Sequence, residues 1–143
     1  MMKILLGMPS YSGMFPSVVF QSIFMLRKPC PMGFMTADRL PIGRARSIIA
    51  GEALRQNYDY LFFVDDDNPI PRDTLIKLVD DNKDIVTVPI LKRKPDEDGS
   101  YPLCAFYGHL DKDIRIYEPI TEFRDEGYLH RIDACGMGCT LIK

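Results

Sequence analysis

The stretch that decides the fold is residues 60–69, which read Tyr60-Leu-Phe-Phe-Val64-Asp65-Asp-Asp67-Asn-Pro69. Its first five residues form a continuous apolar and aromatic run, which predicts a strand buried on both faces. Three consecutive aspartates follow at once, and Pro71 then predicts the start of a helix. We therefore expect a buried strand, an acidic loop and a helix in this order.

The same alternation of short apolar runs and helical periodicity extends to both sides of this stretch. The predicted elements are strands at residues 3–8, 32–36, 60–64 and 84–90, and helices that begin near Pro16, Pro41 and Pro71. In the second of these helices, Ile42, Ala45, Ile49 and Ala53 can share one face. This alternation predicts an α/β fold with a mostly parallel central sheet, helices on both faces and right-handed crossovers.

The pattern changes after Leu91. Residues 103–107 and 114–117 are typical of two antiparallel strands, and residues 129–143 predict a further strand interrupted by Gly136 and Gly138. The expected architecture is a three-layer, Rossmann-like sheet with a short antiparallel C-terminal part.

Length and charge limit the class of protein. The 143 residues fit one domain over 1–143, and a net charge of −2 with 46% hydrophobic residues excludes disordered and collagen-like chains. A cationic nucleic-acid binder would carry a clear excess of Lys and Arg, so we expect no nucleic-acid partner. The N-terminal apolar run is shorter than a signal-peptide core, and no stretch is long enough to span a membrane, so a cytoplasmic location is expected.

The four cysteines do not form a Cys-x-x-Cys pair. A zinc site built from Cys104, His109, Cys135 and Cys139 would have irregular spacing. A cytosolic setting disfavours disulfides, so buried free thiols are the favoured interpretation.

The acidic loop after Val64 is the candidate site. Ligands of open parallel sheets bind beyond the carboxyl ends of the strands. In an extended chain, Asp65 and Asp67 would lie on one side and Asp66 on the other. Oxygen ligands of this kind favour Mg²⁺ or Mn²⁺. The alternative is a solvated acidic turn that caps the following helix.

Four segments together resemble a known family. These are the Leu-Phe-Phe-Val-Asp65-Asp-Asp67 stretch, the preceding helix start Ile-Gly-Arg44-Ala-Arg46-Ser, and the N-terminal Met8-Pro-Ser-Tyr11, with Arg131-Ile-Asp-Ala-Cys-Gly-Met-Gly138 following. In order and spacing they resemble the nucleotide-sugar glycosyltransferases of the GT-A fold, close to glycosyltransferase family two.

The resemblance implies a role for each matching position. Asp65 and Asp67 would hold a divalent metal, Mn²⁺ or Mg²⁺, against the donor diphosphate, with Asp66 near the ribose or the metal. Pro9 and Tyr11 would touch the nucleoside. Asp38 would accept the imide proton of the base, and Arg46, in preference to Arg44, would match a basic position of the family; the alternative for both arginines is a solvated helix surface.

The implied function is transfer of a sugar from a nucleoside diphosphate donor to an acceptor hydroxyl, with inversion of configuration. The donor base, the sugar and the acceptor, whether saccharide, lipid or protein, are not specified by the sequence. The family's general base lies beyond the point where this chain ends, so we expect a C-terminally incomplete domain, a completing chain or a homo-oligomer. Two alternatives remain: a non-catalytic nucleotide-sugar-binding module, and a sugar-nucleotide nucleotidyltransferase, although the loop after the first strand lacks the basic residue of that class.

Overall fold

The computed structural model describes residues 1–92, 94–121 and 127–143. The chain divides into two compact units, one made of residues 1–87 and 137–143 and the other of residues 88–136. Each unit is described by itself, and the expectation of a single domain stays a prediction.

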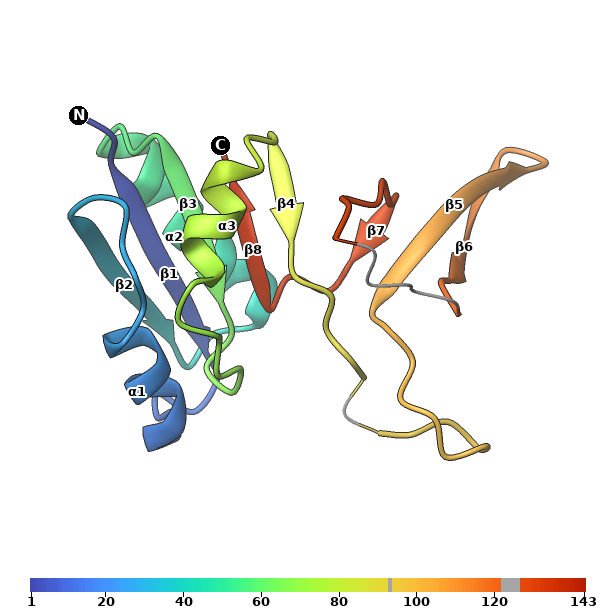
Figure 1. The fold of residues 1–143 in the computed structure, drawn as a ribbon. Coiled ribbons are helices and arrows are strands. Elements are labelled where there is room, and N and C mark those ends of the chain that lie inside the picture. Colours follow the sequence, from blue (N-terminus) through green and yellow to red (C-terminus); the bar gives the residue numbers. More distant parts are fainter. Residues whose placement is uncertain (93, 122–126) are drawn as a thin grey trace. The chain divides into compact units, whose positions relative to one another are not determined.

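The first unit is built on a five-stranded sheet with the strand order β2-β1-β3-β8-β4 (Figure 1). Its strands are β1 (Ile4–Ser10), β2 (Met32–Asp38), β3 (Tyr60–Val64), β4 (Ile85–Thr87) and β8 (Cys139–Ile142). Its helices are α1 (Ser17–Phe24), α2 (Ile42–Arg55) and α3 (Thr74–Asp80). In Figure 1, α2 lies behind this sheet and α3 in front of it.

The sheet is mixed, so the prediction of a mostly parallel, GT-A-like and three-layer Rossmann-like fold is wrong. β1 is parallel to β2 and β3, but β8 lies between β3 and β4 and is antiparallel to both. The reason lies in the connection before β8. Among the described residues between Val88 and Gly136, there is no helix. A crossover helix would return the chain to the other end of the strands, where a parallel strand begins. The chain therefore enters β8 beside the end of β3, where Cys139 pairs with Val64, and must run in the opposite direction.

The packing of α2 against the sheet follows the predicted helical face. Ala45, Ile49 and Ala53 are buried, whereas Ile42 is 51% exposed. Gly7 of β1 allows the close approach, because a Cβ at this position would overlap the Ile49 side chain. The predicted face is thus confirmed apart from its first residue.

β3 spans the five residues predicted for it, and β1 extends two residues further than predicted. Proline is normally tolerated where a strand lacks a partner on one side. β1 pairs with β3 only as far as Gly7, and beyond that point only β2 pairs with it. Pro9 therefore lies inside β1 in a stretch with one partner strand, and Ser10 ends the strand.

The second unit holds a three-stranded antiparallel sheet with the order β6-β5-β7 (Figure 1). Its strands are β5 (Ala105–Asp111), β6 (Ile114–Pro119) and β7 (Ala134–Cys135). The predicted antiparallel pair is confirmed by β5 and β6. The single strand predicted over residues 129–143 is wrong, because β7 and β8 belong to different sheets.

None of the helices in the described ranges has the length and apolar character needed to cross a bilayer.

Candidate functional site

The ends of β1, β2 and β3 meet at one edge of the five-stranded sheet. Ser10 ends β1 and is the register partner of Asp38, which ends β2. Asp65 follows directly after Val64, the last residue of β3. Since all three strands are parallel, these residues lie at the carboxyl edge, where ligands of such sheets bind.

Ser10 joins two loops at this edge. Its hydroxyl donates a 2.6 Å hydrogen bond to Oδ2 of Asp66 and accepts one of 3.0 Å from the backbone N–H of Gly13. Ser10 is 2% exposed, so both bonds are shielded from bulk water. The loop after β1 and the acidic loop after β3 are therefore fixed to each other through one hydroxyl.

Arg46 joins α2 to the acidic loop. Its guanidinium donates a 2.9 Å hydrogen bond to Oδ1 of Asp65, and the two side chains are 22% and 30% exposed. Among the described residues, Nε of Arg46 is a buried side-chain nitrogen without a hydrogen-bond partner. An unpaired buried donor of a charged group is costly, and a phosphate oxygen is a strong acceptor for it.

The acidic loop is a turn rather than an extended segment. The N–H of Asn68 donates to the carbonyl of Asp65 across 3.2 Å, and the N–H of Asp65 donates to the carbonyl of Gly138 across 3.0 Å. The side-chain amide of Asn68 also donates to the Gly138 carbonyl, at 3.3 Å. The alternation of side chains that the sequence argument assumed for Asp65 to Asp67 therefore does not apply here.

The other predicted site residues lie in different surroundings. Pro9 is fully buried inside β1, and Tyr11 is 83% exposed in the loop that follows. Asp38 is exposed, and a Cβ at Gly13, which has φ +73°, would lie 3.6 Å from its Cβ. Asp67 is exposed, beside the half-buried Asp65 and Asp66. These placements bring Asp38 next to the loop after β1.

Arg44 and Arg46 lie in different surroundings on α2. Arg44 is exposed on α2, whereas Arg46 is half-buried and forms the ion pair with Asp65. The arginine with the ion pair is thus the one that turns toward the acidic loop.

A metal site with a complete set of protein ligands is not found. Over residues 1–92, 94–121 and 127–143, no group of three or more histidine, cysteine, aspartate or glutamate side chains is placed to hold a metal ion. Mg²⁺ commonly binds one or two carboxylates and takes its remaining ligands from water and substrate phosphates. The acidic loop fits a cation of that kind, with Asp65 and Asp67 as the carboxylate ligands, only when a phosphate ligand completes the set.

Cys139 lies beside this edge and is chemically inert. It is 3% exposed. Burial, with a smaller contribution from the Asp65 carboxylate, raises the pKa of its thiol from 9.0 to about 12. Since the thiolate is the reactive form, Cys139 is not a candidate nucleophile.

Sequence reasoning missed Ser10, Asn68 and Gly138 as members of this cluster. Ser10 lies between Pro9 and Tyr11, which were both predicted to be site residues. The only sign of its role is that it is the last residue of a parallel strand. The carbonyl of Gly138 reaches Asp65 because β8 is antiparallel to β3, and this pairing was not foreseen.

Comparisons with known proteins support a fold and no family. No protein-family model matches the chain, and no curated protein matches it. Among solved structures, the chain is similar to A197 from STIV, with a TM-score of 0.60 and 19% identity. The alignment covers 99% of this chain, which spans about 65% of the length of A197. At this identity the similarity shows a shared fold alone.

The resemblance to GT-A glycosyltransferases of family two is therefore wrong as an assignment. The chain is similar in structure to A197 from STIV, and within the described part of the chain no metal-holding group of three side chains is present. In the turn after β3, the Asp65 carboxylate accepts a hydrogen bond from Arg46, and the Asp66 carboxylate accepts one from Ser10.

Proposed function

We propose that this chain binds a nucleoside diphosphate sugar at the carboxyl edge of β1, β2 and β3 and transfers the sugar to an acceptor hydroxyl. The proposal rests on the residues at this edge and on no family assignment. The observation that supports it best is the convergence of Arg46 and the acidic loop after β3, joined by the 2.9 Å pair with Asp65.

Arg46 is the proposed contact for the diphosphate. One of its terminal nitrogens is bound to Asp65, and its buried Nε has no partner among the described residues. A guanidinium has five N–H donors in a fixed fork, so it can bind a phosphate while it keeps the pair with Asp65. In this role the carboxylate of Asp65 orients the guanidinium toward the ligand.

Asp65 and Asp67 are the proposed ligands of Mg²⁺ or Mn²⁺. A bound divalent cation stabilises the charge that develops on a departing diphosphate. The chain's own residues fix the loop that holds these carboxylates, since Ser10 binds Asp66 and Gly138 binds the backbone of Asp65. Asp38 and Tyr11, at the ends of neighbouring segments, are the proposed contacts for the nucleoside.

A non-catalytic binding module is the second candidate. The transfer needs a general base for the acceptor hydroxyl. Asp65 and Asp66 already accept hydrogen bonds from Arg46 and Ser10, respectively. These engaged carboxylates favour binding without transfer by this chain alone.

Calorimetric titration tests the binding proposal. UDP, GDP and their sugars are titrated into the protein with and without Mn²⁺, and the Asp65→Asn/Asp67→Asn variant is compared with Asp80→Asn/Asp84→Asn, which removes the same charge elsewhere. We expect Mn²⁺-dependent binding that only the first variant loses. Equal loss in both variants, or no binding by the wild type, would overturn the proposal.

Release of free nucleoside diphosphate from the bound sugar donor then separates the two candidates. Release in the presence of an acceptor alcohol supports the transferase. Binding without any release supports the binding module.

A further inference from the structure

The outward side of α1 has four exposed apolar residues on it or directly after it and no charged residue; its exposed polar residues are Ser17 and Gln21. Val18, Phe20, Phe24 and Met25 are 52%, 58%, 71% and 49% exposed. The opposite side of the helix faces the protein, where Val19 is fully buried. These four exposed residues are called the α1 face below.

The α1 face differs from an ordinary surface helix. The rings of Phe20 and Phe24 stack on each other with their centroids 6.2 Å apart. By contrast, the exposed residues of α2 include Arg44 and Arg55. Helices on protein surfaces normally place charged and polar residues outward, and clustered exposed apolar residues mark an interaction surface.

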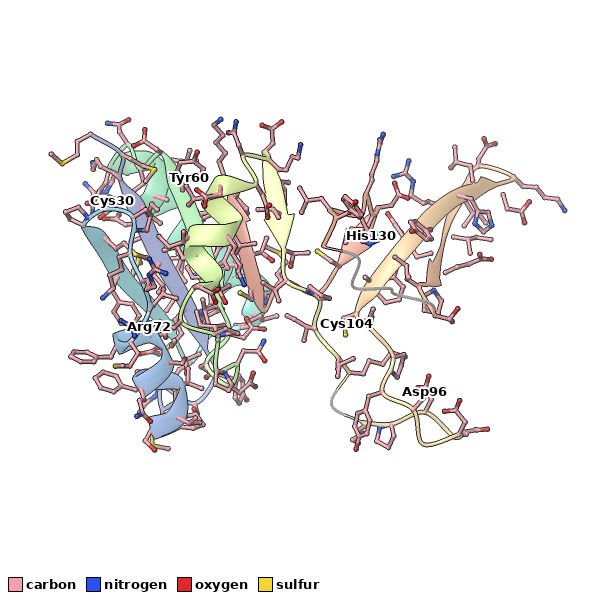
Figure 2. All side chains as sticks on the ribbon, in the orientation of Figure 1. Cys30, Tyr60, Arg72, Asp96, Cys104 and His130 are labelled. Atoms are coloured by element: carbon pink, nitrogen blue, oxygen red, sulfur yellow. The ribbon has the colours of Figure 1, made fainter. Side chains whose placement is uncertain are left out.

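Basic residues lie at the end of the same helix. Arg27 and Lys28 follow α1 and are exposed, and the N–H of Arg27 donates a 2.8 Å hydrogen bond to the carbonyl of Arg72, which is also exposed. Figure 2 labels Arg72 beside α1. The adjacent Asp73 is paired with Lys77 at 2.7 Å and also interacts electrostatically with Arg27. Residues 1–37 contain no aspartate or glutamate, so this region is basic in a chain with a net charge of −2.

We propose that the α1 face docks on the surface of an anionic lipid bilayer. The apolar side chains enter the boundary between headgroups and acyl chains, and Arg27, Lys28 and Arg72 bind the lipid phosphates. Stable attachment of a peripheral protein takes both a buried apolar face and attraction to anionic lipids, and this region combines the two.

The charge distribution favours a bilayer over a second copy of the chain. A twofold interface brings the same surface of both copies together. Here it would place the two basic clusters near each other, and like charges at an interface are unfavourable. An anionic surface complements the same cluster.

Vesicle flotation of the full chain tests this inference. Vesicles of phosphatidylcholine alone are compared with vesicles that contain phosphatidylglycerol, at low and at high salt. We expect binding to the anionic vesicles, weakened by salt, and binding at least tenfold weaker for Phe20→Ser/Phe24→Ser and for Arg27→Gln/Lys28→Gln. Leu54→Ser is the matched control, because Leu54 is 78% exposed on α2.

Each other outcome overturns the inference. One is absence of binding to anionic vesicles, and another is equal binding by Phe20→Ser/Phe24→Ser and wild type with both folded by circular dichroism. A third is concentration-dependent self-association without vesicles that Phe20→Ser/Phe24→Ser abolishes, which would assign the α1 face to a second copy.

Discussion

The guanidinium of Arg46 lies 2.9 Å from the carboxylate of Asp65, and this pair connects α2 to the turn after β3. The pair lies at the carboxyl edge of the parallel strands and keeps part of both side chains accessible. The two side chains are 22% and 30% exposed, and an ion pair with this much solvent contact adds about 0–1 kcal/mol to stability; we propose ligand binding as its main role.

The first prediction concerns Arg46→Gln. The variant should unfold with a free energy within about 1 kcal/mol of wild type. Its affinity for UDP or GDP should fall at least tenfold, because the proposed phosphate donor is lost. Urea denaturation and calorimetric titration measure the two quantities. Arg44→Gln is the control on the same helix, and equal loss of affinity in both variants would contradict the assignment.

The second prediction concerns Ser10→Ala. The substitution removes the hydroxyl that joins Asp66 to the loop after β1 and leaves Gly13 without its acceptor. The free energy of unfolding should fall by about 1–3 kcal/mol, because these groups lose a shielded hydrogen bond. Denaturation of Ser17→Ala, at an exposed position of α1, provides the comparison. A Ser10→Ala variant as stable as Ser17→Ala would refute the bridging role.

The third prediction compares Gly7, where an added Cβ would meet neighbouring side chains, with Gly51, where it would meet none. Gly7→Ala should lower the free energy of unfolding by about 1–3 kcal/mol, because the new methyl group overlaps Ile49. Gly51→Ala should raise it by about 0.5–1 kcal/mol, since Gly51 lies within α2 and a Cβ there meets open space. Chemical denaturation of both variants checks the signs. The same sign in both would contradict the packing of α2 on β1.

The fourth prediction concerns pH. Because the pKa of Cys139 is raised from 9.0 to about 12, the folded state keeps a proton that the unfolded state releases in this interval. The contribution to stability is complete below pH 9 and is lost as the pH rises toward 12, with a slope of about 1.4 kcal/mol per pH unit.

Denaturation at pH 8 and pH 10 measures this effect. Wild type should lose more stability over the interval than Cys139→Ala, which shares its other titrating groups. Equal losses would show that the thiol is not buried as described.

The local elements were predictable because they depend on neighbouring residues. Residues 60–64 form β3 as predicted, because a short continuous run of aromatic and β-branched residues followed by turn residues favours a buried strand. The buried face of α2 followed from helical spacing in the same way. Both properties are encoded within one segment.

The pairing of strands was not predictable from the same information. β8 consists of three apolar residues and Thr140, and this composition does not specify an antiparallel position between β3 and β4. That position depends on how the chain returns after residue 136, which is a long-range property.

The candidate site shows the same division. The position of the three aspartates directly after β3 followed from sequence order. The turn at Asp65 to Asn68 and the bridge from Ser10 depend on contacts between separate strands. Three consecutive aspartates were therefore not enough to predict a metal site formed by protein ligands alone.

The most direct test of the proposed site is a two-dimensional ¹H–¹⁵N NMR spectrum recorded as Mn²⁺ is added in the presence of UDP or GDP. Paramagnetic broadening identifies the amides near the bound cation. The account predicts that broadening centres on Asp65 to Asn68, reaches Ser10 and Asp38, and disappears when the nucleotide is left out. Broadening centred on β5 and β6, or none with either nucleotide, would contradict it.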